Sequence, residues 1–364
     1  MILPARRELW ADSARGLAIL AVVLGHVFLQ EGPETTWTMW GPAQSAWIEL
    51  RDLLLPVRMP LFFLIAGYFA ASAIARPWGT VLRTRTLSLY YLYAVWLLAQ
   101  TLFFLLVPHA GTAAASTVRE LAAQLTYAPN NLWFLVALAA YFTIAKAGAR
   151  IAPVALAGAA WVSWSAFTDR LPDFFDRTPM PEYLVFFLLG AYAPGLLRRI
   201  RGSAPLVLAG ALGLMAGVNA MHDAESRMLW TNYLLLSTVA GVTAVVSLLK
   251  LLEAQGLLPR STVWVGRRTL PIYVVQLPLA IAVDALIGLL PREVAQAIFG
   301  NPLVSSVYPI AVTAIVVAAA LALHHLVQRV APWMYRAPWL HRAPEARRAT
   351  PSPASGIVSS RGAR

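Results

Sequence analysis

The sequence predicts an all-α integral membrane protein with about ten transmembrane helices, and three observations lead to that prediction. Of the 364 residues, 59% are hydrophobic and only 13% are charged, whereas a soluble globular protein carries about a quarter charged residues. Ten apolar runs approach the length of about 20 residues that a helix needs to cross a bilayer. The Lys and Arg residues between these runs fall mainly in alternate loops. Together these features indicate a polytopic membrane chain.

The ten runs are justified by their apolar content and by the residues that interrupt or flank them. Prolines such as Pro60, Pro271 and Pro278 fall inside some runs, which membrane helices tolerate when neighbouring groups satisfy the freed backbone. Tryptophan and tyrosine near the ends of several runs fit an interfacial belt. The expected spans, of which the fifth and sixth are the shortest, are residues 10–28, 53–75, 87–107, 131–149, 151–168, 182–197, 204–221, 229–250, 270–290 and 306–328.

The distribution of positive charge predicts which side of the membrane each loop faces. Of the 29 Lys and Arg residues, 21 lie at the N-terminus, in the even-numbered loops and in the C-terminal tail, and six lie in the other loops. Because cytoplasmic loops are rich in Lys and Arg, we expect both termini in the cytoplasm. The net charge of +12 is therefore interpreted as a topology signal, and no nucleic-acid partner is expected.

Domain organisation is expected to be simple. Residues 1–330 form one transmembrane domain, whose first apolar run is retained because no small-residue cleavage site follows it. Residues 331–364 are rich in Pro, Ala, Arg and Ser and are expected to form a disordered, basic cytoplasmic tail that contacts anionic membrane lipid. The chain has no cysteine, which excludes disulfides, thiolate metal sites and cysteine nucleophiles.

The first apolar run carries two polar side chains, Arg15 at its start and His26 near its end. Eleven residues of helix turn through about 1,100°, so both side chains lie on nearly the same face, about 16 Å apart along the axis. Asp12 precedes Arg15 by three residues and is expected to pair with it. Charged groups within a span usually face a bundle interior or a watery cavity. The alternative is that both side chains reach the two membrane interfaces.

The second run contains a further charge, Arg58, between Pro56 and Pro60 in LLLPVRMPLFFLIAGYFAAS. The chain enters this run from the outside, so Arg58 lies at a depth close to that of His26. An arginine beside a histidine suggests recognition of an anion, or stabilisation of an oxyanion with the histidine as base. The alternative is that Arg58 only anchors the outer end of its helix.

These residues resemble a known family. RGLAILAVVLGH at residues 15–26 and VRMPLFFLIAGYF in the second run are similar to motifs of the membrane-bound acyltransferase-3 family, whose members include bacterial enzymes that O-acylate sugars and polysaccharides. VLRTRTLSLYYLYAVW, NNLWFLVALAAYF, EYLVFFLLGAYAPG and RRTLPIYVVQLPL agree with later segments of that family. The resemblance covers roughly residues 8–330.

The resemblance implies transfer of an acyl group, usually acetyl, from cytoplasmic acyl-CoA to a hydroxyl of a carbohydrate or glycolipid acceptor. It implies a multi-pass protein of the bacterial inner membrane with no permanently bound cofactor. His26 corresponds to the essential histidine of the family, Arg15 to the arginine of the same motif, and Arg58 to the arginine of the second-span motif. One departure is Gln276, which stands where many members have a histidine and cannot titrate at neutral pH.

Roles follow for these side chains. His26 is expected to deprotonate the acceptor hydroxyl or to carry the acyl group, since imidazole has a suitable pKa, and Arg58 to hold the carbonyl oxygen. Arg15, oriented by Asp12, would meet the pantetheine or a phosphate of CoA. Arg83 and Arg85 are candidates for binding the CoA phosphates, and the alternative is that they are ordinary basic residues of a cytoplasmic loop. Trp133 is a candidate for lining the cavity or the acceptor path, and the alternative is an ordinary interfacial tryptophan.

Other chemistries have less support. The remaining histidines show no spacing typical of a metal site, so no metal is expected, and the chain has neither a P-loop nor a GxSxG motif. The main alternative to an enzyme is a multi-pass transporter of an anionic or lipid-linked sugar substrate, since buried charges also line transport pathways. No internal repeat typical of many transporters is visible. A non-enzymatic scaffold would leave the buried charges unexplained.

Overall fold

The computed structural model describes residues 8–30, 43–107, 115–171 and 179–340, and every regular element within these ranges is a helix. This confirms the all-α class. Seven described segments are long and apolar enough to cross a membrane: Leu9–Val27, Gln44–Ile74, Trp78–Leu106, Trp133–Phe167, Ala204–His222, Arg227–Ala254 and Pro302–Val330. The chain is therefore a multi-pass membrane protein by the length and composition of its helices.

The expected number of ten spans is not confirmed, although each of the ten predicted runs contains helix. Helices α7 (Trp133–Gly148) and α8 (Ala152–Phe167) are joined directly by a 3-10 turn, η2 (Ala149–Ile151), into one continuous apolar stretch. Two other apolar helices, α9 (Met180–Tyr192) and α15 (Gln276–Ile287), have 13 and 12 residues. A helix of that length measures about 20 Å, which is less than the roughly 30 Å hydrocarbon core. The cytoplasmic position of the termini stays a prediction.

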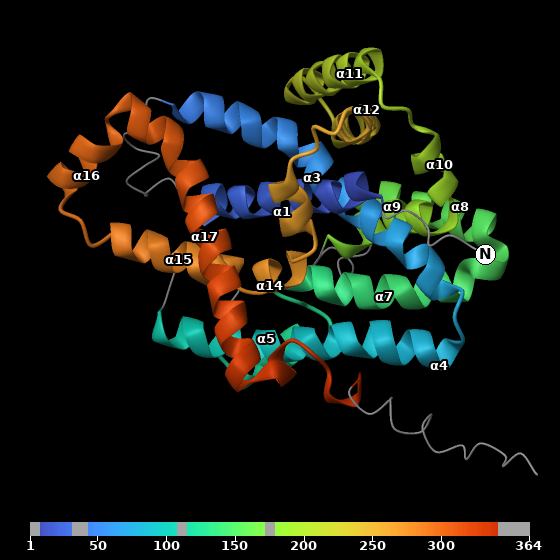
Figure 1. Ribbon diagram of the computed structural model, residues 1–364, viewed down its shortest axis with the longest axis horizontal. Coiled ribbons are helices and arrows are strands. Elements are labelled where there is room, and N and C mark those ends of the chain that lie inside the picture. The colour runs from blue at the N-terminus through green and yellow to red at the C-terminus, as the bar shows by residue number, and fades with distance from the viewer. Residues whose placement is uncertain (1–7, 31–42, 108–114, 172–178, 341–364) are drawn as a thin grey trace, which may run out of the picture.

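Helices α1 (Leu9–Gln30) and α3 (Gln44–Ile74) lie at the centre of the bundle (Figure 1). Helices α11 (Ala204–His222) and α12 (Arg227–Ala254) pack on one side of this pair. Helices α5 (Leu87–Leu106) and α7 lie on the opposite side. The long helix α17 (Pro302–Val330) runs across α1 and α15. Helix α1 consequently contacts neighbours from both ends of the sequence.

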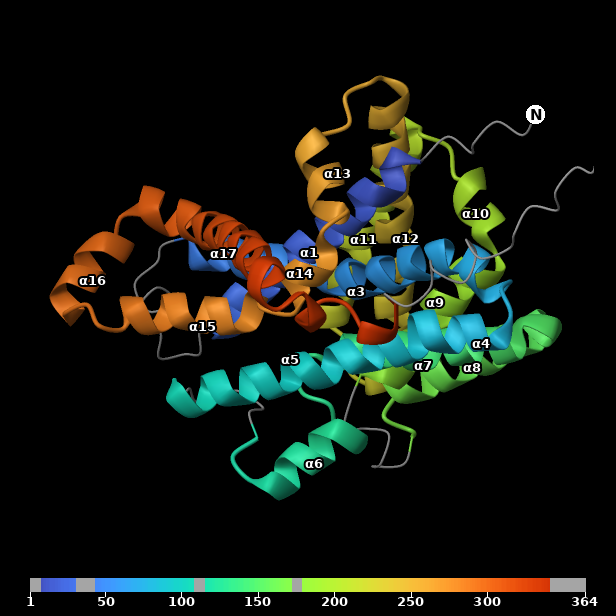
Figure 2. The same ribbon diagram turned by 60° about the horizontal axis from the view of Figure 1, so that its bottom comes forward.

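Short helical elements connect and cap the long ones. Figure 2 shows α13 (Arg260–Gly266) alongside α1, and α6 (Val118–Thr126) beyond α5. One of them, η1, is π-helical, a distortion that is frequent at functional sites. These elements are α4 (Trp78–Val81), η1 (Leu82–Thr86), α6 (Val118–Thr126), α10 (Pro194–Arg199), α13 (Arg260–Gly266), α14 (Thr269–Tyr273), α16 (Arg292–Phe299), η3 (Pro332–Met334) and η4 (Pro338–Leu340).

The start of α6 is fixed by a reciprocal cap. The side chain of Thr117 accepts a hydrogen bond from the backbone N–H of Glu120, and the Glu120 carboxylate accepts from the backbone N–H and the hydroxyl of Ser116. Such an arrangement satisfies N–H groups that have no partner within the helix. These hydrogen bonds lower the pKa of the Glu120 carboxyl.

Two helix crossings depend on glycine. A Cβ atom at Gly16 would overlap the carbonyl oxygen of Thr262, and one at Gly266 would overlap that of Asp12, so α1 and α13 touch through their backbones. Gly67 of α3 and Gly190 of α9 form a second pair of this kind. Close backbone approach of this type is how helices associate in membranes, where apolar side chains gain little by leaving lipid.

The backbone groups freed by helix breaks find partners on neighbouring helices. Pro60 has no N–H, so the carbonyl of Pro56 has no partner within α3, and the hydroxyl of Thr238 donates to it at 2.8 Å. Between α14 and α15 the helix is interrupted, and the amide of Gln100 donates to the Val274 carbonyl at 2.8 Å. Such compensation allows a broken helix to persist at membrane depth.

The first part of the expected C-terminal tail is folded. Residues 331–340 lie against α5, where the indole N–H of Trp96 donates to the Met334 carbonyl at 2.9 Å and the ring of Tyr335 packs on Trp96. Arg83 and Trp339 exchange hydrogen bonds between side chain and backbone. Aromatic anchors therefore extend the packed domain beyond the expected boundary at 330, and residues 341–364 lie outside the described part of the chain.

The crossing of α3 and α9 provides a test of this packing. Gly190→Ala places a methyl group against the carbonyl of Leu64, and we expect it to lower the free energy of unfolding by about 1–3 kcal/mol through overpacking. The measurement is thermal unfolding of the purified protein in detergent. Gly158→Ala on α8 is the matched control, because no atom lies within 4 Å of its added methyl. Equal stability of the two variants would contradict the role of the glycine pair.

Candidate functional site

The structure brings His26 and Arg58 together. Gly25 precedes His26 on α1, and a Cβ atom at Gly25 would overlap the Nη1 atom of Arg58 from α3. The guanidinium therefore lies directly against the backbone of α1, beside the histidine, and the two side chains interact electrostatically. His26 and Arg58 are both partly buried. The proximity expected from their similar depth is thus present in the fold.

An aromatic cluster adjoins this pair and fixes the position of Trp133. Tyr183 of α9 interacts electrostatically with Arg58, and its ring stacks on Phe63 with centroids 5.5 Å apart and on Trp133 with centroids 5.9 Å apart. Trp133 is partly buried in this cluster. Trp133 therefore packs on the tyrosine that interacts with Arg58. Sequence reasoning did not single out Tyr183, whose only signal is a tyrosine beside Glu182 at the start of an apolar run.

A second region, around Arg15, is a pocket of about 270 Å³ that contains two arginines. Arg15 donates a hydrogen bond from Nη2 to the hydroxyl of Thr269 at 3.1 Å, and its guanidinium lies 5.3 Å from the ring centroid of Phe69. Arg85 of the π-helical segment η1 lines the same pocket, with its guanidinium 5.6 Å from the ring centroid of Phe142. Two guanidinium groups on aromatic walls form a site that suits a phosphorylated ligand.

Arg83 and Asp12 each have a partner that the sequence did not predict. Arg83 points away from the two-arginine pocket and bonds to the Trp339 carbonyl at 2.8 Å. The buried carboxylate of Asp12 pairs at 3.0 Å with Arg267, which follows α13. Asp12 thus joins α1 to α13, because the glycine crossing brings Arg267 to this turn of α1, and the expected pairing of Asp12 with Arg15 stays a prediction.

Gln276 lies at the first residue of α15, directly after the helix interruption, and is 2% exposed. Its side-chain oxygen is buried and has no hydrogen-bond partner in the described part of the protein. A buried polar atom without a partner costs free energy unless a ligand or water supplies a hydrogen bond. The position is therefore compatible with contact to a bound molecule, as expected for a residue of the late-span motif.

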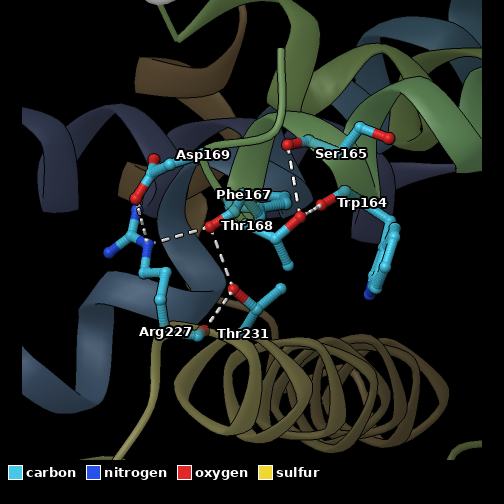
Figure 3. A network of polar contacts seen from close by, with 7 residues as sticks. All are labelled: Trp164, Ser165, Phe167, Thr168, Asp169, Arg227 and Thr231. Carbon is cyan, nitrogen blue, oxygen red and sulfur yellow. Dashed lines mark hydrogen bonds and ion pairs between the residues drawn. The ribbon is translucent and has the colours of Figure 1, made fainter.

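A separate polar network closes the ends of α8 and α12 (Figure 3). Arg227 pairs with Asp169 at 2.9 Å and donates to the Phe167 carbonyl at 2.9 Å, and the hydroxyl of Thr231 donates to the same carbonyl at 3.0 Å. Asp169 has a φ of 55°, a left-handed conformation that Asp adopts more readily than most residues. The network borders a small cavity of about 160 Å³ lined by Glu182 and Trp230 among others.

Metal chemistry gains no support from the site. Within the described ranges, no group of three His, Asp or Glu side chains is arranged to hold a metal ion. His109 and His341 lie outside those ranges. The chemistry that the described arrangement offers is that of a histidine, three guanidinium groups and a buried amide, which can bind anions, move a proton and stabilise a developing negative charge.

A bundle of apolar helices with a histidine–arginine pair and a two-arginine pocket inside it defines a membrane protein with a charged interior site. The family model of an acyltransferase domain, that of acyltransferase family 3, matches residues 8–325. The chain therefore belongs to this family.

A curated relative supports the membrane assignment. The inner membrane protein YcfT of Escherichia coli K12 is 29% identical to this chain over 163 residues. The match spans 40% of this chain and 45% of the relative, so the aligned part covers less than half of each protein. No solved structure matches the chain.

The Asp12–Arg267 pair yields a stability prediction. Asp12→Asn removes the buried negative charge that pairs with the partly exposed Arg267, and we expect a loss of about 1–3 kcal/mol in the free energy of unfolding. Urea or thermal unfolding in detergent measures it. Asp169→Asn is the control, because the Asp169–Arg227 pair is exposed on both sides and such pairs contribute about 0–1 kcal/mol. A larger loss for Asp169→Asn would contradict the assignment.

Proposed function

We propose that the protein is a membrane O-acyltransferase that moves an acyl group, in the first instance acetyl, from cytoplasmic acyl-CoA to a hydroxyl of a carbohydrate or glycolipid acceptor. The observation that carries the proposal is the packing of the Arg58 guanidinium against Gly25, directly beside His26. Membership of the acyltransferase-3 family supports the same reaction class. The bacterial relative is an inner membrane protein by name, which supports placement of this chain in a bacterial inner membrane.

The proposed reaction uses the histidine–arginine pair at the reacting carbonyl. His26 takes the proton of the acceptor hydroxyl, whose oxygen attacks the thioester carbonyl, and Arg58 donates to the oxygen on which negative charge develops. The carbon–sulfur bond then breaks, and the CoA thiolate leaves with the proton that His26 releases. In the covalent variant of this mechanism, the acyl group first passes to the imidazole and then to the acceptor.

The donor is assigned to the two-arginine pocket. Arg15 and Arg85 are its cationic residues, and guanidinium groups bind phosphate with paired hydrogen bonds. Arg15 and His26 lie on the same helix, about 16 Å apart along its axis. An extended pantetheine chain held at Arg15 can therefore bring its thioester toward His26. Gln276, with its unpaired buried oxygen, is a candidate acceptor for an N–H or hydroxyl of either substrate.

The first test is transfer of label from acetyl-CoA to a panel of sugars and glycolipids by the purified protein. We expect His26→Ala to lower the transfer rate by about 10²–10⁴-fold, the usual contribution of a general base. Product mass spectrometry measures the rate. His222→Ala is the matched control, because this histidine is exposed and far from α1 in the sequence, bonded to Asp52.

Two further results decide between the proposals. Gly25→Ala displaces the Arg58 guanidinium and keeps His26, so it should also lower the rate if the pair acts as described. Uptake of a labelled anionic sugar into proteoliposomes, without any covalent product, would instead support the transporter hypothesis. Full activity of His26→Ala would contradict the assigned mechanism.

The donor pocket predicts a difference between two neighbouring arginines. Arg85→Gln is expected to raise the KM for acyl-CoA by about tenfold, which corresponds to the loss of about 1.4 kcal/mol of binding free energy. Arg83→Gln should change the KM much less, since its guanidinium bonds to the Trp339 carbonyl outside the pocket. Steady-state kinetics over a range of acyl-CoA concentrations measures both. A larger effect of Arg83→Gln would place the CoA phosphates on the other side of η1.

A further inference from the structure

A further cavity, of about 450 Å³, lies between α1, α3, α12 and α17. Its walls are made of Leu, Ala, Val and Ile side chains, and only Arg58 and Thr313 contribute polar groups. The volume falls in the range of about 300–1,000 Å³ that is usual for small-molecule sites. Neither His26 nor Arg15 lines it. The proposed reaction assigns no ligand to this cavity.

The cavity opens on the outside of the helix bundle. Leu17 on α1 and Ile310 on α17 belong to its lining and are 36% and 58% exposed. In a membrane protein, apolar side chains exposed in the middle of long apolar helices face lipid. Along α1 the lining extends from Leu17 to Leu24, about 10 Å at 1.5 Å per residue. The cavity is therefore an elongated apolar recess whose open side faces hydrocarbon.

The two polar groups of the cavity are available to a ligand. Arg58 makes no hydrogen bond or ion pair with another described residue, although its charge is held among apolar helices. The hydroxyl of Thr313 is buried and has no hydrogen-bond partner in the described part of the chain, and the residue is 8% exposed. A cation and an unsatisfied hydroxyl in an otherwise apolar recess complement a molecule with a long apolar chain and a polar, anionic end.

The faces of α1 relate this cavity to the catalytic pair. Leu17 and Leu24 lie about 160–180° around the helix from Arg15 and His26, whereas Gly25 lies between the two faces. The Arg58 guanidinium packs on Gly25, so it borders both the cavity and His26. Because a guanidinium has five N–H donors, it can contact a ligand in the cavity and a group beside the histidine together.

We propose that this cavity binds one hydrocarbon chain of a membrane lipid whose anionic head meets Arg58, and that this lipid carries the acceptor hydroxyl to His26. The orientation of the recess agrees with the expected topology, because Arg58 lies near the outer surface and the recess extends from it toward the membrane centre. A lipid of the outer leaflet is oriented in the same way, with its head at the outer surface and its chain toward the membrane centre. The link to acyl transfer rests on the proposed function, whereas lipid binding itself does not.

The test is photolabelling of the full chain in phosphatidylcholine nanodiscs. The probe is dodecyl phosphate with a diazirine on its chain, and peptide mass spectrometry locates the adducts. We expect saturable labelling of residues 17–24 and 310–314. Ala21→Phe fills the recess from α1 and should reduce this labelling by about tenfold. Ala322→Phe is the matched control, because this exposed residue lies two turns beyond Ala314 on α17, outside the lining.

The polar groups are tested with the same probe and its uncharged analogue, dodecanol with the same diazirine. Arg58→Gln should lower dodecyl phosphate labelling to the level of dodecanol, and Thr313→Val should lower it less. Thermal unfolding verifies that each variant is folded. If Ala21→Phe does not fold, Ala314→Phe fills the recess from the opposite wall.

Each outcome decides the proposal independently of catalysis, because labelling requires no acyl-CoA. Labelling that does not saturate, or that is unchanged by both filling variants, would overturn it and mark the recess as ordinary contact with bilayer lipid. Equal labelling by dodecanol and dodecyl phosphate in the unaltered protein would remove the role of Arg58 and with it the proposal. Saturable labelling in a protein that transfers no acyl group would retain the lipid site and reject the enzyme.

Discussion

The contact between Arg58 and the backbone of α1 at Gly25 is the interaction on which the interior of this bundle depends. Charged side chains within membrane spans are rare and usually face the interior of the bundle or a cavity. Here the guanidinium belongs to Arg58, which lies on α3 between Pro56 and Pro60. Gly25 has no side chain, so the guanidinium fits against the backbone of α1. Any larger residue at that point would displace the charge. His26, the aromatic cluster and the apolar recess all adjoin this one group.

The sequence predicted the elements of this arrangement better than their contacts. The apolar runs identify the helices because their length and composition are unusual outside membranes, and helical spacing placed Arg15 and His26 on one face. The spacing of residues along one helix does not show which other helix packs against it. Asp12 pairs with Arg267 because two glycines, 250 positions apart, allow α1 and α13 to touch. Arg83 and Arg85, two residues apart, lie on different sides of their helical segment, as i and i+2 side chains do, and only the tertiary structure shows which partner each one meets.

The same argument explains the number of spans and the extent of the tail. Hydropathy alone cannot distinguish two helices separated by a short turn from one continuous apolar stretch, as at residues 149–151. Nor can the composition of residues 331–364 reveal that the first ten of them pack on α5 through tryptophan and tyrosine side chains. In both places the decisive information is a tertiary contact. Residues such as Gly25 and Thr313, whose importance lies in what they leave open or unpaired, have the weakest signal in one sequence.

Helix α1 separates two kinds of space. One of its faces turns toward a pocket with two arginines, and the opposite face turns toward a recess that is open to hydrocarbon. The two compartments share no lining residue, and the Arg58 guanidinium reaches across the helix at its glycine. If the two proposals hold, a water-soluble donor and a lipid-borne acceptor can occupy the protein together, each entering by its own side of α1. In the direct form of the proposed reaction, this separation would permit a ternary complex of protein, donor and acceptor.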